Sequence, residues 1–100
     1  MPYILDGRRP SIDAALEPLV EALKALGVID GDINYTVTSL LALVFDIGEK
    51  PSYTKIMTII GTLEAVKLEF YRRVAGPYED EKIRANGDVE EYAHRRDDPL

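Results

Sequence analysis

Apolar residues recur at intervals of three and four in the first third of the chain, which is the spacing of one face of an α-helix. The residues of this stripe are Ile12, Leu16, Leu19, Leu23 and Leu26. Ser11 is a good N-terminal cap and Gly27 a good stop, so we expect an amphipathic helix between them. Pro18 lies inside the pattern and has no N–H group, so the helix either kinks at Pro18 or begins near it.

A wider apolar pattern follows at 33–45, a stretch of 13 residues without a charge. Asp32 can cap a helix that begins at Ile33 and ends at Phe45 or Ile47. Its apolar residues cover about 200° of a helical wheel, more than a surface helix needs, so we expect this helix to be the most buried one. The stretch is too short to cross a bilayer, which takes about 20 apolar residues.

Two more helices are expected in the second half of the chain. Ser52 can cap a long helix over 53–75, which the dipeptide Gly76-Pro77 should stop. Pro77 also suits the first turn of a shorter helix that reaches Asn86 and ends at Gly87.

The expected class is all-α, a small bundle of three main helices and a short fourth helix, because no window alternates like a half-buried strand. We expect one helical domain over 1–89. Residues 90–100 are expected to form a charged tail, since 88–100 contains seven charges.

Composition narrows the class of protein. With 46% hydrophobic and 30% charged residues and a mean hydropathy of -0.13, the chain has the balance of a soluble globular protein. A net charge of -6 argues against binding of duplex nucleic acid, which rests on neutralising phosphates. The absence of Cys excludes disulfides, thiolate metal sites and a Cys nucleophile. No secretory signal or membrane span is recognised, so we expect a cytoplasmic protein with no membrane partner.

Two opposite charges interrupt the apolar arc of the helix over 53–75. Its expected solvent face consists of Thr58, Thr62, Ala65 and Glu69. Glu64 and Lys67, by contrast, fall among the apolar residues. Since burying an unpaired charge is costly, they either pair with each other, pair with another chain, or line a wet pocket.

The corner between the last two helices combines arginines, tyrosines and a lysine. Arginine forks suit phosphate or carboxylate, tyrosine faces suit a base, and a helix start suits an anion. The residues expected to bind such a ligand are Lys67, Tyr71, Arg72, Arg73, Tyr78 and Lys82, with Glu64 and Asp80 as partner carboxylates. The alternative is that Arg72 or Arg73 simply pairs with the acidic residues at 79–81.

Much of the chain over 28–89 resembles a small family of uncharacterised proteins from phages and prokaryotes. The matching runs are Asn34-Tyr35, Gly61-Thr-Leu-Glu64, Lys67-Leu-Glu69-Phe-Tyr-Arg72-Arg73, Pro77-Tyr-Glu-Asp80, Lys82-Ile and Asn86-Gly-Asp88-Val. The resemblance implies a phage origin, a small helical domain and a shared surface around the charged residues, without an established activity. Family members tend to have Glu before Asn-Gly-Asp, where this chain has Ala85.

Two helices with wide apolar arcs are hard to cover with one amphipathic helix and a polar fourth one, so we expect a homo-oligomer. Gly61, in the middle of a helix, costs up to ~1 kcal/mol relative to Ala, which suggests a close helix crossing there.

Enzymatic requirements fit the chain poorly. A helical nucleoside triphosphate pyrophosphohydrolase needs acid pairs at helical spacing for Mg²⁺, whereas Glu64 and Glu69 are five residues apart. The one histidine, His94, lies in the charged tail. We therefore expect no catalytic residue, metal or cofactor.

The expected function is that of a non-enzymatic helical oligomer that binds an anionic, nucleotide-like ligand, by analogy with phage proteins that sequester nucleotide signals of bacterial immunity. Two alternatives stay open. One is a protein interaction or assembly module without a small-molecule ligand, and the other is the Mg²⁺-dependent pyrophosphohydrolase.

Overall fold

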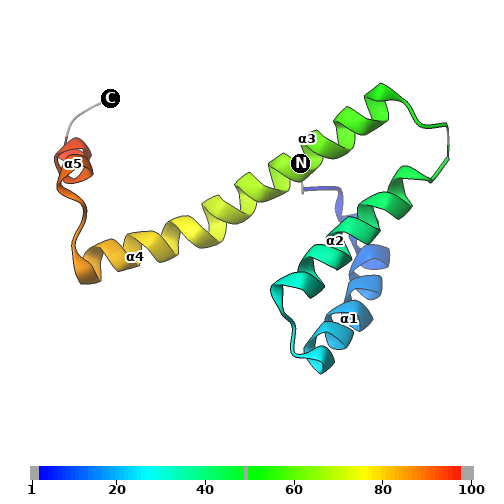
Figure 1. Cartoon of the computed structure of the whole chain (residues 1–100), viewed down its shortest axis with the longest axis horizontal. Helices are drawn as coiled ribbons and strands as arrows, with labels where there is room; N and C mark the ends of the chain where they lie inside the picture. Colours follow the sequence, from blue (N-terminus) through cyan, green and yellow to red (C-terminus); the bar gives the residue numbers. More distant parts are fainter. Residues whose placement is uncertain (1–2, 49, 98–100) are drawn as a thin grey trace. The chain divides into compact units, whose positions relative to one another are not determined.

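The computed structural model describes residues 3–48 and 50–97, and every regular element within them is a helix (Figure 1). The helices are α1 (Arg9–Leu26), α2 (Asp30–Phe45), α3 (Tyr53–Phe70), α4 (Gly76–Asn86) and α5 (Glu90–Ala93). Single 3-10 turns precede α1 (Asp6–Arg8) and follow α5 (His94–Asp97). The all-α class is confirmed, with three long helices and a shorter fourth.

Contacts between Cα atoms divide the chain into two units, Met1–Leu63 and Glu64–Leu100. The first unit contains α1, α2 and the first part of α3. The second contains the rest of α3, α4 and α5, and all of the predicted ligand-binding residues belong to it.

Helix α1 begins earlier than predicted and passes through Pro18 without interruption. The start shifts from Ser11 to Arg9 because Pro10 then occupies the first turn, where its missing N–H is no loss. Gly27 ends the helix in the left-handed conformation, with φ of 68°, as predicted for a glycine stop.

Asp32 supports the start of α2, although not as the cap. The helix begins at Asp30, and the Asp32 carboxylate accepts a hydrogen bond from the backbone N–H of Ile29 at 3.0 Å. Asp30 and Asp32 both lie in the first turn, where a negative charge complements the helix dipole.

The turn between α2 and α3 is held by polar contacts of Ser52 and Lys55. The Ser52 hydroxyl accepts the N–H of Lys55 at 3.1 Å, which confirms Ser52 as the cap of α3. The Lys55 ammonium donates to the carbonyl of Ile47 at 2.7 Å and lies 5.2 Å from the centre of the Phe45 ring. One lysine therefore ties the end of α2 to the start of α3.

The prediction that Gly76-Pro77 stops the third helix is wrong, because helical backbone continues from Tyr53 to Asn86. A π-helical turn (Tyr71–Ala75) joins α3 to α4, and the Gly76 N–H bonds to the carbonyl of Tyr71. Pro77 has no N–H for the carbonyl of Arg73, so the wider turn accommodates the proline without ending the helix. Gly87, with φ of 89°, follows the last turn of α4.

None of the described side chains is buried. The helix over 33–45 was predicted to be the most buried one, and α2 does contain more half-buried residues than any other helix, but most of its apolar side chains remain exposed. Leu43 of α2 is 68% exposed and Ile33 is 55% exposed. The pattern predicted apolar faces, and within the described residues these faces remain largely exposed. No close crossing occurs at Gly61 either, since an added Cβ would have nothing within 4 Å.

Within the described residues, no helix is both long enough and apolar enough to cross a membrane.

Candidate functional site

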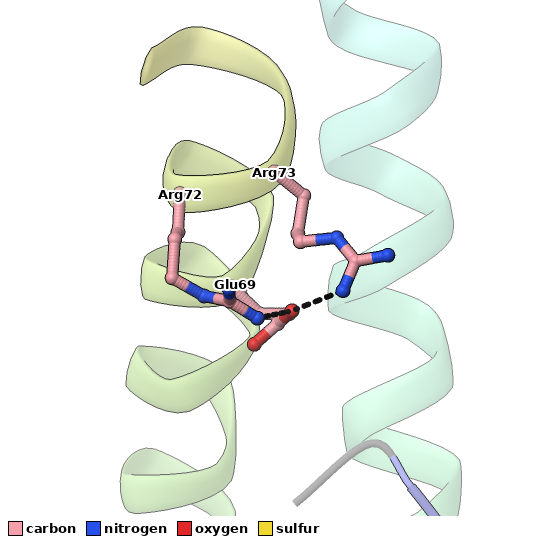
Figure 2. A network of polar contacts seen from close by, with 3 residues as sticks. All are labelled: Glu69, Arg72 and Arg73. Atoms are coloured by element: carbon pink, nitrogen blue, oxygen red, sulfur yellow. Dashed lines mark hydrogen bonds and ion pairs between the residues drawn. The ribbon is translucent and has the colours of Figure 1, made fainter. Parts of the chain in front are cut away.

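Two arginines converge on one carboxylate where α3 passes into the π-helical turn (Figure 2). Arg72 Nη2 lies 2.7 Å from Glu69 Oε1, and Arg73 Nη1 lies 3.9 Å from the same oxygen. The spacings of three and four residues place all three side chains on adjoining parts of the helix surface. We call Glu69, Arg72 and Arg73 the arginine cluster.

Glu69 is the least exposed member of the arginine cluster, with a side chain 25% exposed against 62% for Arg72 and 61% for Arg73. The prediction placed Glu69 and Ala65 on the solvent face, whereas the structure makes both half-buried. For Glu69 the reason is local, because the side chains of Arg72 and Arg73 lie against its carboxylate.

Tyr71 is linked to α4 by its hydroxyl group, which donates to the two carboxylate oxygens of Glu79 at 2.9 and 3.0 Å. This hydrogen bond raises the pKa of Tyr71 above its usual value of 10.0, and the negative charge of Glu79 adds to the effect. The contact spans the π-helical turn, so it couples the end of α3 to the first turn of α4.

Tyr78 and Lys82 form the second aromatic contact, with the Lys82 ammonium 5.4 Å from the centre of the Tyr78 ring. Both residues line a shallow hollow of about 290 Å³ together with Glu81 and Ala85. The spacing of four residues along α4 explains the cation–π contact.

Glu64 and Lys67 pair with each other at 3.5 Å, which is the first of the three arrangements considered for them. Their side chains are 57% and 71% exposed, respectively. The pair is therefore a surface ion pair at a spacing of three residues, a type that contributes about 0.2–0.5 kcal/mol.

The predicted ligand-binding residues do not converge on a single point in the second unit. Arg72 and Arg73 share Glu69, Tyr71 contacts Glu79, and Lys82 lies over Tyr78. Asp80 pairs with none of the described residues in this unit, although the sequence suggested it as a partner carboxylate.

The hydrogen bond between Tyr71 and Glu79 was not predicted from the sequence. The two residues are eight positions apart, and the sequence placed a helix boundary between them. Spacing carried a signal for the arginine cluster but none for this bond, which depends on the helix continuing through Gly76 and Pro77.

Chemically, the second unit offers guanidinium and ammonium groups that can bind an anion, each close to an acidic or aromatic side chain. In the part of the chain that the structure describes, no group of three or more His, Asp or Glu side chains could hold a metal ion.

The surface of the first unit has several hollows. One, of about 470 Å³, is lined by residues between Asp30 and Thr38, all from one helix, so it is a groove along α2. A second, of about 350 Å³, lies at the turn between α2 and α3 and is lined by Ile47, Lys50, Ser52, Thr54 and Lys55. A third, of about 260 Å³, lies between α2 and α3 and is lined by apolar side chains alone. Its lining residues are Leu41, Ala42, Phe45, Ile56, Ile59 and Ile60. We call it the α2–α3 hollow.

A sequence model described as "Domain of unknown function (DUF6899)" matches residues 1–89. No curated protein matches the chain, and no solved structure matches it.

Proposed function

Because the chain belongs to the DUF6899 family of domains of unknown function, we propose its function from its own surfaces: it is an interaction module that binds another protein chain through apolar helix faces. The observation that carries the proposal is the exposure of the large apolar side chains on all three long helices. Large exposed apolar patches are rare on monomers and typical of protein interfaces.

Energetics support the proposal. Full burial of one Leu, Ile, Val or Phe side chain contributes about 1.5–3 kcal/mol, and ordering each backbone residue costs about 1–2 kcal/mol. A chain that leaves these side chains in water lacks the main term that offsets the cost of ordering. Contact with a partner supplies that term.

The test combines light scattering with binding of the apolar dye ANS. We expect the chain either to exceed 11.2 kDa in solution or, when diluted to a monomer, to bind ANS strongly. A monomer of 11.2 kDa that melts cooperatively and binds no ANS would contradict the proposed function.

A second candidate function is binding of an anionic, nucleotide-like ligand at the arginine cluster. The observation that favours it is that two guanidinium groups approach one carboxylate oxygen, the arrangement in which they would also hold a phosphate oxygen. Such a ligand would take the place of the Glu69 carboxylate between Arg72 and Arg73.

Incubation with a panel of nucleotides and Mg²⁺, followed by measurement of both binding and turnover, tests this candidate. Intact ligand recovered after heating supports the binder, and release of pyrophosphate supports the enzyme. Arg73→Lys, which keeps the charge but loses the planar fork, should weaken binding by roughly 1.5–3 kcal/mol. Lys82→Arg serves as the matched control outside the arginine cluster. Equal affinity of the Arg73→Lys variant and the unsubstituted chain would refute the cluster as the site.

A further inference from the structure

The α2–α3 hollow is a surface of the first unit that apolar side chains alone line. Its side chains come from the last turns of α2 and from the first half of α3, and all of them remain partly or largely exposed. Ile56 is 41% exposed and Ile60 is 54% exposed. An apolar hollow of about 260 Å³ has room for a few apolar side chains of a partner.

Charge is almost absent from the segments that form this surface. Residues 33–45 carry no charge, and residues 51–63 carry one, Lys55. The Lys55 ammonium lies over the Phe45 ring and donates to the Ile47 carbonyl, so it makes these contacts within the first unit. The acidic residues that give the chain its net charge of -6 lie outside both segments, and two of them, Asp46 and Glu49, lie between the two segments in the sequence.

This charge distribution identifies the kind of partner that fits. A partner with a charged surface would be matched by opposite charges on this face, since interfaces arrange complementary potentials. A second copy, by contrast, has the same net charge of -6, and in a two-fold interface each patch meets its own equivalent. A like-charged copy can approach closely only through a face that carries no acidic residues.

Resting on the proposed function, we infer that the partner is a second copy of this chain, whose apolar side chains fill the α2–α3 hollow in a symmetric interface. Helices α2 and α3 of each copy pack against the α2–α3 hollow of the other copy, so one interface covers both hollows.

The test uses the full chain in light scattering across the micromolar range. We expect a mass that is a multiple of 11.2 kDa. Ile60→Glu places a carboxylate inside the hollow, where two copies would bring like charges together without water. We expect it to weaken association by at least about 100-fold.

Thr62→Glu is the matched control, because it adds the same charge to α3 about 160° around the helical wheel from Ile60. It should change the dissociation constant by less than about threefold. Ile60→Ala keeps the helix and adds no charge, so it tests the face even where Ile60→Glu unfolds, and should weaken association by about tenfold. Circular dichroism shows whether each variant remains helical.

The outcomes separate this inference from the proposed function. A monomeric wild-type chain that binds ANS would refute the inference that the partner is a second copy. The chain would then still be an interaction module, with a different partner. An oligomer that responds equally to Ile60→Glu and Thr62→Glu would place the interface elsewhere and overturn the inference alone. A monomer with no ANS binding would overturn both.

Discussion

At the scale of single residues, Tyr71 has the most distinctive environment in the second unit. Its neutral hydroxyl donates to Glu79, and this bond raises its pKa above 10.0. Because the folded pKa is raised, the contribution to stability is complete below the unfolded pKa of about 10 and is lost as the pH rises through the folded pKa.

We predict that Tyr71 ionises above its usual pKa of 10.0 in a spectrophotometric titration. Tyr71→Phe should remove a component at the alkaline end of the curve, and Glu79→Gln should move the pKa of Tyr71 down toward its usual value. Tyr78→Phe is the control, since Tyr78 contacts a lysine rather than a carboxylate. A titration curve unchanged at its alkaline end by Tyr71→Phe would contradict the prediction.

The ion pair of Glu64 and Lys67 provides a second prediction. Replacing both by Leu and Met should change the free energy of unfolding by less than about 1 kcal/mol, because an exposed pair of this kind contributes little. Chemical denaturation measures the change. Lys67→Met alone tests whether Lys67 also binds a ligand. If nucleotides bind at the arginine cluster, this variant should have the same nucleotide affinity as the unsubstituted chain.

A large loss of stability in the double variant would mean that the pair is buried in the functional assembly. Each single substitution would then cost more than the double one, because it leaves one charge without its partner.

At the scale of the helix, the two prolines of α1 make a natural comparison. Pro18 lies inside the helix, where it removes a hydrogen bond and crowds a carbonyl, whereas Pro10 lies in the first turn. Pro18→Ala should therefore raise the stability of the fold by up to about 3 kcal/mol, and Pro10→Ala should have little effect. Thermal melts of both variants provide the measurement, and equal shifts would mean that Pro18 imposes no strain.

Local signals in the sequence were sufficient for several helix ends. Ser52 and Gly27 each act within one turn of the helix they cap, so their roles could be identified without knowledge of the rest of the fold. Gly76-Pro77 was misinterpreted because a proline can either start a new helix or be absorbed by a wider turn of an existing one. The choice depends on the backbone of residues 71–75, which no residue pattern specifies.

In the candidate site, too, contacts set by spacing along one helix were open to prediction, and the contact across the π-helical turn was not. The contacts of Arg72 and Arg73 with Glu69 follow from spacing along one helix, although the sequence pointed to the acids at 79–81 instead. The bond from Tyr71 to Glu79 could not be predicted, because its geometry requires a continuous helix where a break was expected.

At the scale of the whole molecule, the hydrophobic pattern identified which faces are apolar but not what covers them. The wide arc of α2 predicted burial, either within the chain or against another copy, and Leu43 and Ile33 are exposed in the single chain. Periodicity describes one helix at a time, and a face that packs within the chain has the same pattern as a face that packs against another copy. This is why the homo-oligomer remains a proposal that rests on the α2–α3 hollow.

The local character of the contacts also has a kinetic consequence. Nearly all contacts among the described residues join positions close together in the sequence, and such helices form within microseconds. Covering the α2–α3 hollow with a second copy then makes the last step of folding a collision between two chains. In stopped-flow refolding, raising the protein concentration tenfold should accelerate this step by about tenfold while encounter limits it. A rate independent of concentration would assign the step to the single chain. In a cell, completion of folding would thus follow second-order kinetics, and the half-time of this step would be longest when few copies of the chain are present.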